Sequence, residues 1–158
     1  DERLVDLAEV IGSGFIRGDT PEVLDHLTFT PDFAVVSPGF SPSHDLVQEL
    51  TRREVTLITD IDLAYRLRDK NQRIAKWLVI TGTNGKTTTC ELTAAMLIAD
   101  GLRAVACGNI GNPILDAIRD PEGFDFLVVE LSSFQLHYGK WNCHQIRSRS
   151  IFFKNPAP

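Results

Sequence analysis

The residues with the clearest chemical potential form a glycine-containing loop, GTNGKT, at positions 82–87. Glycines allow backbone N–H groups to turn inward around a phosphate, and the N-terminus of a following helix favours the same anion. Lys86 would neutralise the β- and γ-phosphates of a nucleotide, and the Thr87 hydroxyl would help to hold Mg²⁺. The pattern predicts a phosphate site made by Gly82, Thr83, Asn84, Gly85, Lys86, Thr87 and Thr88.

This loop departs from the strict P-loop pattern, which has a glycine five positions before Gly85, where this chain has Ile80. The alternative is a chance Gly-Lys-Thr in a surface turn. The loop directly follows the apolar run WLVIT at 77–81 and precedes a helical pattern. That strand–loop–helix context favours phosphate binding over a chance match.

Glu130 is the second candidate, because it directly follows the apolar run at 124–129. Active sites of open parallel sheets form beyond the carboxyl ends of the strands. A carboxylate at that edge could hold Mg²⁺ beside a triphosphate, although alone it would be an ordinary strand-end glutamate. We therefore predict Lys86 and Glu130 as the catalytic pair, with Thr87 and Glu130 as metal ligands.

The elements that must position these residues alternate between strands and helices. Apolar runs predict strands at 33–36, 55–58, 77–81, 103–107 and 124–129, and helical spacing predicts helices at 4–11, 44–53, 61–67 and 113–119. A further helix follows the phosphate loop, where Leu92, Ala95, Met96 and Ala99 are helically spaced and Gly101 gives the stop signal. This alternation is typical of parallel sheets with right-handed crossovers.

We therefore expect an α/β fold, with a Rossmann-like half first and a parallel sheet that carries the phosphate loop second. A polar linker is expected around 69–76, and residues 139–158 form an atypical tail. The glycines at 12, 14 and 18 do not make a dinucleotide fingerprint, because its third glycine position is occupied by Arg17.

Composition narrows the class of protein further. The 158 residues carry a net charge of −5, which argues against nucleic acid as the main partner. No export signal or membrane-length apolar run is visible, so a cytoplasmic protein is expected. The three cysteines match neither a disulfide framework nor a zinc site, and the adjacent Cys143 and His144 are interpreted as incidental. The tail contains four basic residues and no acidic ones.

Four separated motifs resemble the Mur ligases and, more distantly, the folylpolyglutamate synthetases. They are TGTNGKTT at 81–88, GNIGNP at 108–113, ELSSFQL at 130–136, and SPG at 37–39 with His44 and DIDL at 60–63 downstream. The family form of the loop has an aliphatic residue where the usual P-loop has glycine, so Ile80 fits the resemblance. The match runs from Ala34 to Tyr138 and does not extend into the tail. This resemblance implies the domain bounds: a partial Rossmann-like N-terminal domain at 1–72, followed by part of a P-loop parallel-sheet ATP-binding domain at 73–138.

The resemblance implies an ATP- and Mg²⁺-dependent ligase that adds D-glutamate to UDP-N-acetylmuramoyl-L-alanine through an acyl phosphate. It implies a monomer, and the charge and apolar runs described above add that no nucleic-acid or membrane partner is expected. Asn109 and the 37–39 turn would face the UDP-sugar diphosphate or its attached groups, and two further residues would line the site near the reacting carboxylate. The implied substrate-binding set is Ser37, Pro38, Gly39, Asn109, Ser132 and Gln135.

The resemblance also indicates missing parts. The family's uracil pocket would precede Asp1, and neither the histidine and lysine of its second metal site nor its amino-acid-binding domain is found in this sequence. We therefore expect the isolated chain to be an inactive fragment. The alternatives are a P-loop ATPase or kinase fragment, a folylpolyglutamate-synthetase-like ligase, and a non-catalytic nucleotide-binding fragment.

Overall fold

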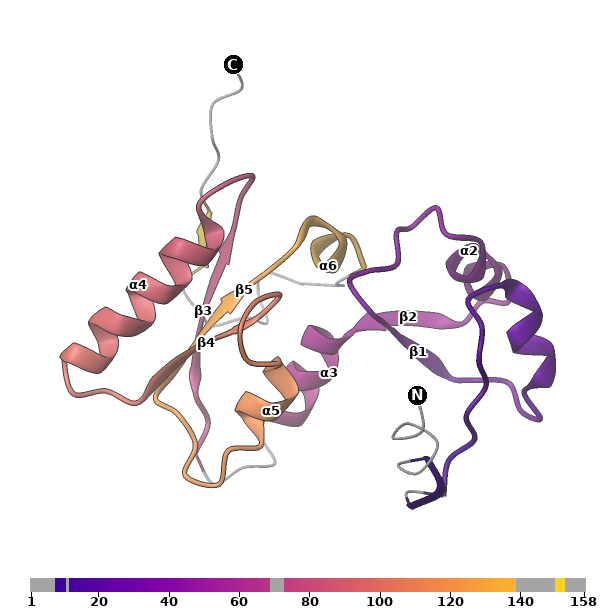
Figure 1. Cartoon of the computed structure of the whole chain (residues 1–158), viewed down its shortest axis with the longest axis horizontal. Helices are drawn as coiled ribbons and strands as arrows, with labels where there is room; N and C mark the ends of the chain where they lie inside the picture. Colours follow the sequence, from indigo (N-terminus) through magenta and orange to yellow (C-terminus); the bar gives the residue numbers. More distant parts are fainter. Residues whose placement is uncertain (1–7, 11, 69–72, 139–149, 153–158) are drawn as a thin grey trace.

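The computed structural model describes residues 8–10, 12–68, 73–138 and 150–152, the last of these as backbone. It contains two parallel β-sheets, as predicted (Figure 1). Most of the helix predicted at 4–11, the linker residues 69–72, and Cys143 with His144 lie outside the described residues. None of the described helices is long and apolar enough to cross a membrane.

The first sheet pairs β1 (Phe33–Val36) with β2 (Thr56–Thr59) in parallel, in the register Val36↔Thr59. In the sequence, α2 (Asp45–Arg52) connects these two strands, and it buries Val47 and Leu50. The His44 side chain caps this helix by accepting a hydrogen bond from the Leu46 N–H at 3.3 Å. A 3₁₀-helix, η1 (Pro21–His26), precedes β1 and was not predicted.

The second sheet has the order β4-β5-β3-β6, and all its neighbouring strands are parallel. The strands are β3 (Lys76–Thr81), β4 (Ala104–Gly108), β5 (Phe126–Glu130) and β6 (Ser150–Phe152). The first three match the predicted strands to within two residues. The fourth was not predicted, because it comes from the segment that we interpreted as an atypical tail.

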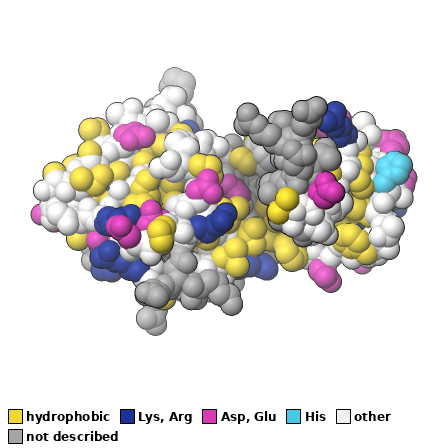
Figure 2. Space-filling view, turned by 60° about the horizontal axis from the view of Figure 1, so that its bottom comes forward, with side chains coloured by type: hydrophobic (Ala, Val, Ile, Leu, Met, Phe, Trp, Pro, Cys, Tyr) yellow, Lys and Arg dark blue, Asp and Glu magenta, His cyan; other side chains and the backbone are white. Residues whose placement is uncertain are grey.

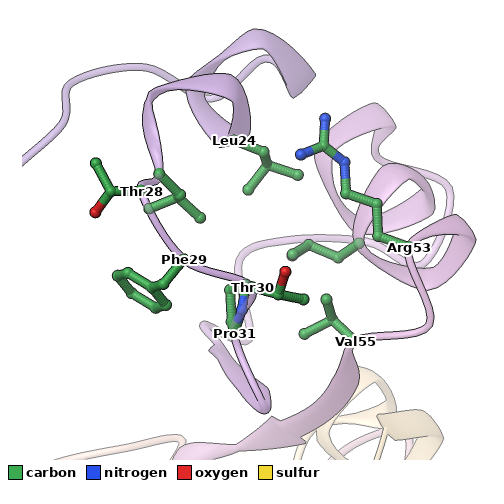
Figure 3. A pocket seen from close by; sticks show the side chains of 9 residues that line it. Leu24, Thr28, Phe29, Thr30, Pro31, Arg53 and Val55 are labelled. Carbon is green, nitrogen blue, oxygen red and sulfur yellow. The ribbon is translucent and has the colours of Figure 1, made fainter.

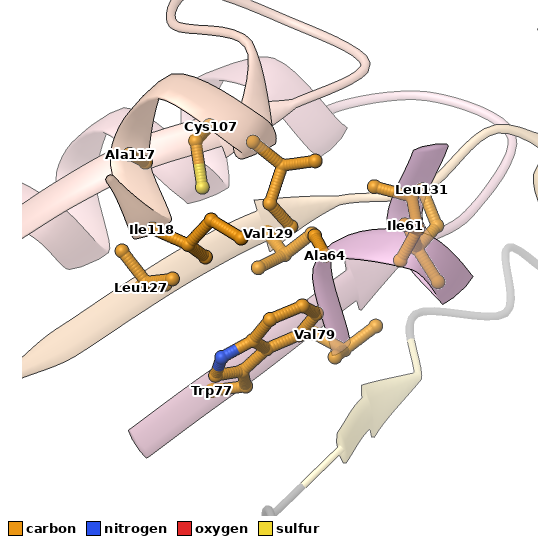
Figure 4. Packing of buried hydrophobic residues seen from close by; sticks show 11 residues of the cluster. Ile61, Ala64, Trp77, Val79, Cys107, Ala117, Ile118, Leu127, Val129 and Leu131 are labelled. Atoms are coloured by element: carbon orange, nitrogen blue, oxygen red, sulfur yellow. The ribbon is translucent and has the colours of Figure 1, made fainter. Parts of the chain in front are cut away.

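Helices cover the two faces of the second sheet. On one face, α4 (Lys86–Ala99) packs Cys90 and Ala94 against Ile80, Ala106 and Val128. On the other face, α3 (Asp60–Leu67) and α5 (Ile114–Ile118) cover a larger core. Figure 4 shows this core, which contains Ile61, Ala64, Trp77, Val79, Cys107, Ile114, Ala117, Ile118, Leu127, Val129 and Leu131.

Helix α3 shares its core with the second sheet, although its sequence lies in the segment assigned to the first domain. Its buried residues Ile61 and Ala64 belong to the same cluster as Trp77 and Leu127. A capping box at Thr59 and Asp62 fixes the start of α3, where the Asp62 N–H donates to the Thr59 hydroxyl at 3.2 Å. The domain boundary at residue 72 stays a prediction.

The apolar stripe that predicted α4 is not the side that packs on the sheet. Leu92 is 59% exposed and Met96 is 71% exposed, whereas Cys90 and Ala94 are buried. The reason is the helix start at Lys86, which directs positions 90, 94 and 97 toward β3, β4 and β5. The helix ends as predicted, because the Leu102 N–H donates to the Leu97 carbonyl at 3.0 Å in a glycine C-cap.

A further helix, α6 (Ser133–Tyr138), follows β5 and was not predicted. It lies between the two sheets in Figure 1. Its residue Tyr138 packs with Val36 and Val47 of the first sheet region. The chain therefore returns from the second sheet to the first through this helix.

Candidate phosphate-binding site

Three neighbouring strands of the second sheet end at the same edge. In the register of this sheet, Glu130 on the central strand β5 lies between Ile80 on β3 and Gly108 on β4. The phosphate loop follows β3 directly, and Asn109 follows β4. Parallel pairing therefore brings together segments that lie far apart in the sequence, at the edge where open sheets bind ligands.

The loop at 82–87 connects β3 to the N-terminus of α4. Gly85 is the N-cap of α4 and has a φ of 73°. This left-handed backbone conformation costs free energy for residues that have a Cβ. The Lys86 ammonium donates to the Gly82 carbonyl at 2.9 Å and to the Thr83 carbonyl at 3.5 Å, so it lies over the loop itself. Thr83, Asn84, Thr87 and Thr88 are exposed around it.

Glu130 is buried, with a residue exposure of 2%. Its Oε2 accepts a hydrogen bond from the Thr87 hydroxyl at 2.9 Å, and its Oε1 accepts one from the Asn109 amide Nδ2 at 3.2 Å. The Asn109 backbone N–H also donates to the Glu130 carbonyl at 3.0 Å. These bonds hold the carboxylate beside the first turn of α4, and so beside the phosphate loop.

The oxygen atoms at this position suit Mg²⁺. A protein usually binds Mg²⁺ through one or two carboxylates and leaves the remaining positions to phosphates and water. Glu130 and the Thr87 hydroxyl would be the ligands from the chain. Within the described ranges, no group of three or more His, Cys, Asp or Glu side chains could hold a metal without such help.

Gly108 allows the close contact between β4 and β5 at this edge. Its φ is 101°, and an added Cβ would lie 2.6 Å from the Glu130 carbonyl oxygen. Real Cβ atoms essentially never come that near to a backbone atom, so only glycine fits without a shift of one strand. Gly108 thus permits the close spacing of β4 and β5 at which the Asn109 side chain reaches Glu130.

The other predicted substrate residues lie in two places. Ser132 follows Glu130 by two positions on the same edge, and its hydroxyl accepts a hydrogen bond from the Gln135 N–H at 3.1 Å. The 37–39 turn follows β1 in the other sheet, where the Phe40 N–H donates to the Ser37 carbonyl at 3.0 Å. Gln135 is fully buried, with both ends of its side-chain amide hydrogen-bonded within the chain.

The sequence interpretation named neither Asp60 nor Tyr138 as a site residue, although Asp60 begins the DIDL motif at 60–63. Asp60 accepts a hydrogen bond from the Gln135 side chain at 3.0 Å, and the Tyr138 hydroxyl donates to the Phe40 carbonyl at 3.3 Å. A local signal existed for part of this arrangement, because Ser132 with Gln135 fits the capping-box pattern of a helix start. The contacts with Asp60 and Phe40 have no local signal.

Among the described residues, two cavities border the first sheet region, and neither is lined by the phosphate loop or Glu130. One, of about 280 Å³, lies before β1 and beside the end of α2, with Leu24, Phe29, Arg53 and Val55 in its wall (Figure 3). The other, of about 790 Å³, is lined by residues of α2, β2 and α6.

Figure 2 shows acidic and basic side chains intermixed on one face, without a large field of one sign.

The fold and the loop are those of an α/β unit of the P-loop type. Residues 80–147 match the family described as "Mur ligase middle domain", a range that extends past the predicted end of the resemblance at Tyr138. Together with the relatives below, this match shows that the chain belongs to the Mur ligase family.

Three relatives carry the name UDP-N-acetylmuramoylalanine--D-glutamate ligase. The protein from Tropheryma whipplei (strain Twist) is 49% identical over 130 residues, which are 82% of this chain and 26% of the relative. The Leifsonia xyli subsp. xyli protein is 50% identical over 140 residues, covering 84% of this chain and 27% of the relative. The Streptomyces coelicolor protein is 42% identical over 135 residues, covering 85% and 28%. The chain thus spans about a quarter of the length of these relatives.

Proposed function

We propose that this chain is the ATP-binding part of a ligase that adds D-glutamate to UDP-N-acetylmuramoyl-L-alanine. The observation that carries the proposal is the arrangement of Thr87, Glu130 and Asn109 at the end of the phosphate loop. The names of relatives that are about half identical to this chain support the choice of substrates. The monomeric state remains a prediction from the resemblance, and the cytoplasmic location remains a prediction from the sequence.

The proposed chemistry begins with a poor electrophile, the carboxylate of the substrate's terminal alanine. Transfer of the γ-phosphoryl group of ATP to this carboxylate makes an acyl phosphate, which has a good leaving group. The D-glutamate amine then attacks the acyl carbon, and phosphate leaves from the tetrahedral intermediate to form the amide. Phosphoryl transfer depends mainly on positioning and on stabilisation of charge.

The residues of this chain have distinct parts in that scheme. The backbone of residues 82–88 and the Lys86 ammonium bind and neutralise the ATP phosphates. Thr87 and Glu130 hold Mg²⁺, which when bound offsets the charge that develops during transfer. Asn109, together with Ser37, Pro38 and Gly39, faces the UDP-sugar. Ser132 belongs to the part of the edge nearest the reacting carboxylate, and the buried Gln135 acts there through its hydrogen bonds to Ser132.

Binding of substrates to the chain tests the proposal. Calorimetry should show saturable binding of a non-hydrolysable ATP analogue that requires Mg²⁺, and binding of UDP-N-acetylmuramoyl-L-alanine that folate does not displace. Displacement by folate would favour a folylpolyglutamate-type ligase. Nucleotide binding without UDP-sugar binding would favour a simple P-loop ATPase, kinase or non-catalytic fragment.

Turnover is a separate question from binding. Because the chain spans about a quarter of its relatives, we expect it to release no phosphate when given ATP, UDP-N-acetylmuramoyl-L-alanine and D-glutamate. Phosphate release that depends on both of the latter substrates would contradict this expectation.

A further inference from the structure

Helix α6 begins three residues after Glu130, and it contacts both regions of the chain. Its buried residues are Gln135 and Tyr138. Gln135 faces the N-terminus of α3, and Tyr138 faces the segment that follows β1. Figure 1 shows the helix between the two sheets. This short helix is therefore the described link between the phosphate edge and the 37–39 turn.

Gln135 forms the first contact, and its burial makes that contact specific. Its Oε1 accepts a hydrogen bond from the Ser132 N–H at 2.9 Å, and its Nε2 donates to Asp60 Oδ1 at 3.0 Å. The residue is 0% exposed, so a broken bond would leave a polar group without water. Such groups carry a large penalty, which makes the Gln135–Asp60 pair a strong constraint on where α6 lies.

Tyr138 forms the second contact, with the first sheet region. Its hydroxyl donates to the Phe40 carbonyl at 3.3 Å, and its ring packs with Val36 and Val47. A tyrosine hydroxyl is protonated at neutral pH and can donate, and burial raises the pKa of Tyr138 further in the same direction. Because the Phe40 N–H closes the turn onto Ser37 at 3.0 Å, Tyr138 holds the same residue from its carbonyl side.

We propose that Gln135 and Tyr138 are positioning residues through which α6 clamps the 37–39 turn at a fixed place relative to Glu130. The assignment of that turn to the UDP-sugar rests on the function proposed above, whereas the clamp itself rests on these contacts. Loosening the clamp lowers the affinity for the UDP-sugar, because the turn must then be ordered on binding. Nucleotide affinity stays unchanged, because the loop and Glu130 keep their contacts.

A donor–acceptor inversion tests the first contact. Gln135→Glu keeps an oxygen for the Ser132 N–H but presents a carboxylate to Asp60, which removes the donor. Asp60→Asn alone keeps an acceptor for the Gln135 amide and serves as the matched control. In the double variant, the amide introduced at position 60 donates to the carboxylate introduced at position 135, which restores the bond. Tyr138→Phe removes the second contact while keeping the ring.

The rate of hydrogen exchange at the Phe40 amide measures how often the 37–39 turn opens, because local opening governs exchange. We expect exchange to become about tenfold faster in Gln135→Glu and in Tyr138→Phe, the effect of one buried hydrogen bond. Asp60→Asn should behave like the unaltered chain, and the double variant should recover its slow exchange. Amides of Val79 and Val128 should change little, which excludes general destabilisation. Unchanged exchange in Gln135→Glu, or no recovery in the double variant, would overturn the clamp.

Affinities measured on the same variants connect the clamp to function. Gln135→Glu should bind UDP-N-acetylmuramoyl-L-alanine about tenfold more weakly and the magnesium complex of the ATP analogue as the unaltered chain does, with recovery in the double variant. An equal loss of both affinities would contradict the positioning role. If the unaltered chain binds neither ligand, the proposed function fails, while the exchange measurements still decide whether the clamp exists.

Discussion

Glu130 shows what residue types can and cannot predict. Its position after an apolar run indicated a strand-end carboxylate near a phosphate loop, and the structure places it 2.9 Å from the Thr87 hydroxyl. The sequence did not predict Asn109 as its second partner, because that contact depends on the order of the strands. The roles of these residues in binding substrates remain proposals.

The two buried cysteines allow a prediction at the residue scale. Burial raises the pKa of Cys90 from 9.0 to about 12, with a smaller contribution from the nearby Glu130, and burial raises that of Cys107 to about 12. At pH 8 the reactive thiolate should be about a thousandfold rarer than for a free thiol. Iodoacetamide should therefore modify both residues only after unfolding.

Peptide mapping by mass spectrometry would measure this modification with and without urea. Peptides that contain Cys90 and Cys107 should be unmodified in the native chain and modified in urea. Rapid labelling of either residue in the native chain would show that the cores on the two faces of the second sheet are not packed as described.

At the element scale, local sequence predicted strands and helices well but predicted faces and partners poorly. The strands β1 and β3 follow from apolar runs, and the end of α4 just before Gly101 follows from a glycine cap. The spacing of Leu92 and Met96 predicted α4 but did not identify its buried side, because these two residues are as apolar as the residues that pack. Which side faces the sheet depends on the connection through the phosphate loop, and periodicity does not contain that information.

Gly108 gives a prediction for the β4–β5 pair. Gly108→Ala should destabilise the chain by about 2–4 kcal/mol, because its Cβ would meet the Glu130 carbonyl while φ is positive. Gly101→Ala is the matched control: its φ is +81° but its Cβ would meet nothing within 4 Å, so about 1 kcal/mol is expected. Urea unfolding measures both, and equal losses would contradict the close approach of the two strands.

Helix α2 carries a pH-dependent contribution to stability. Hydrogen bonds from Arg52 and Arg53 lower the pKa of Glu49 from 4.5 to about 2. Because the folded-state pKa is depressed, the stabilisation is complete above pH 4.5 and is lost as the pH falls toward 2. The bonds are at the surface, so salt should weaken the effect.

Thermal unfolding of the chain and of Glu49→Gln at several pH values tests this contribution. The unaltered chain should be the more stable of the two at pH 6, and the difference should shrink as the solution is acidified. A difference that is the same at pH 6 and at the acid end of the series would show that the ion pairs with Arg52 and Arg53 do not form.

At the scale of the whole molecule, sequence alternation predicted an α/β fold with parallel sheets, and the structure confirms it. The strand order β4-β5-β3-β6 was not predictable, because long-range pairing determines it. The same holds for α6, whose contacts with Asp60 and Phe40 join segments 75 and 98 residues apart. The candidate site depends on both features, because the strand order aligns the strand ends and α6 connects them to the first sheet.

The central claim is that the loop at 82–87 binds the phosphates of a magnesium–nucleotide complex, with Lys86 as its cation. The most direct test is calorimetric titration of the chain with a non-hydrolysable ATP analogue and Mg²⁺, before and after Lys86→Ala. Lys76→Ala, an exposed lysine at the opposite end of β3, is the control. Lys86→Ala should weaken binding by about 10- to 100-fold, the value of a charge-assisted hydrogen bond, with Lys76→Ala unchanged. Equal affinity in the unaltered chain and Lys86→Ala would contradict the account.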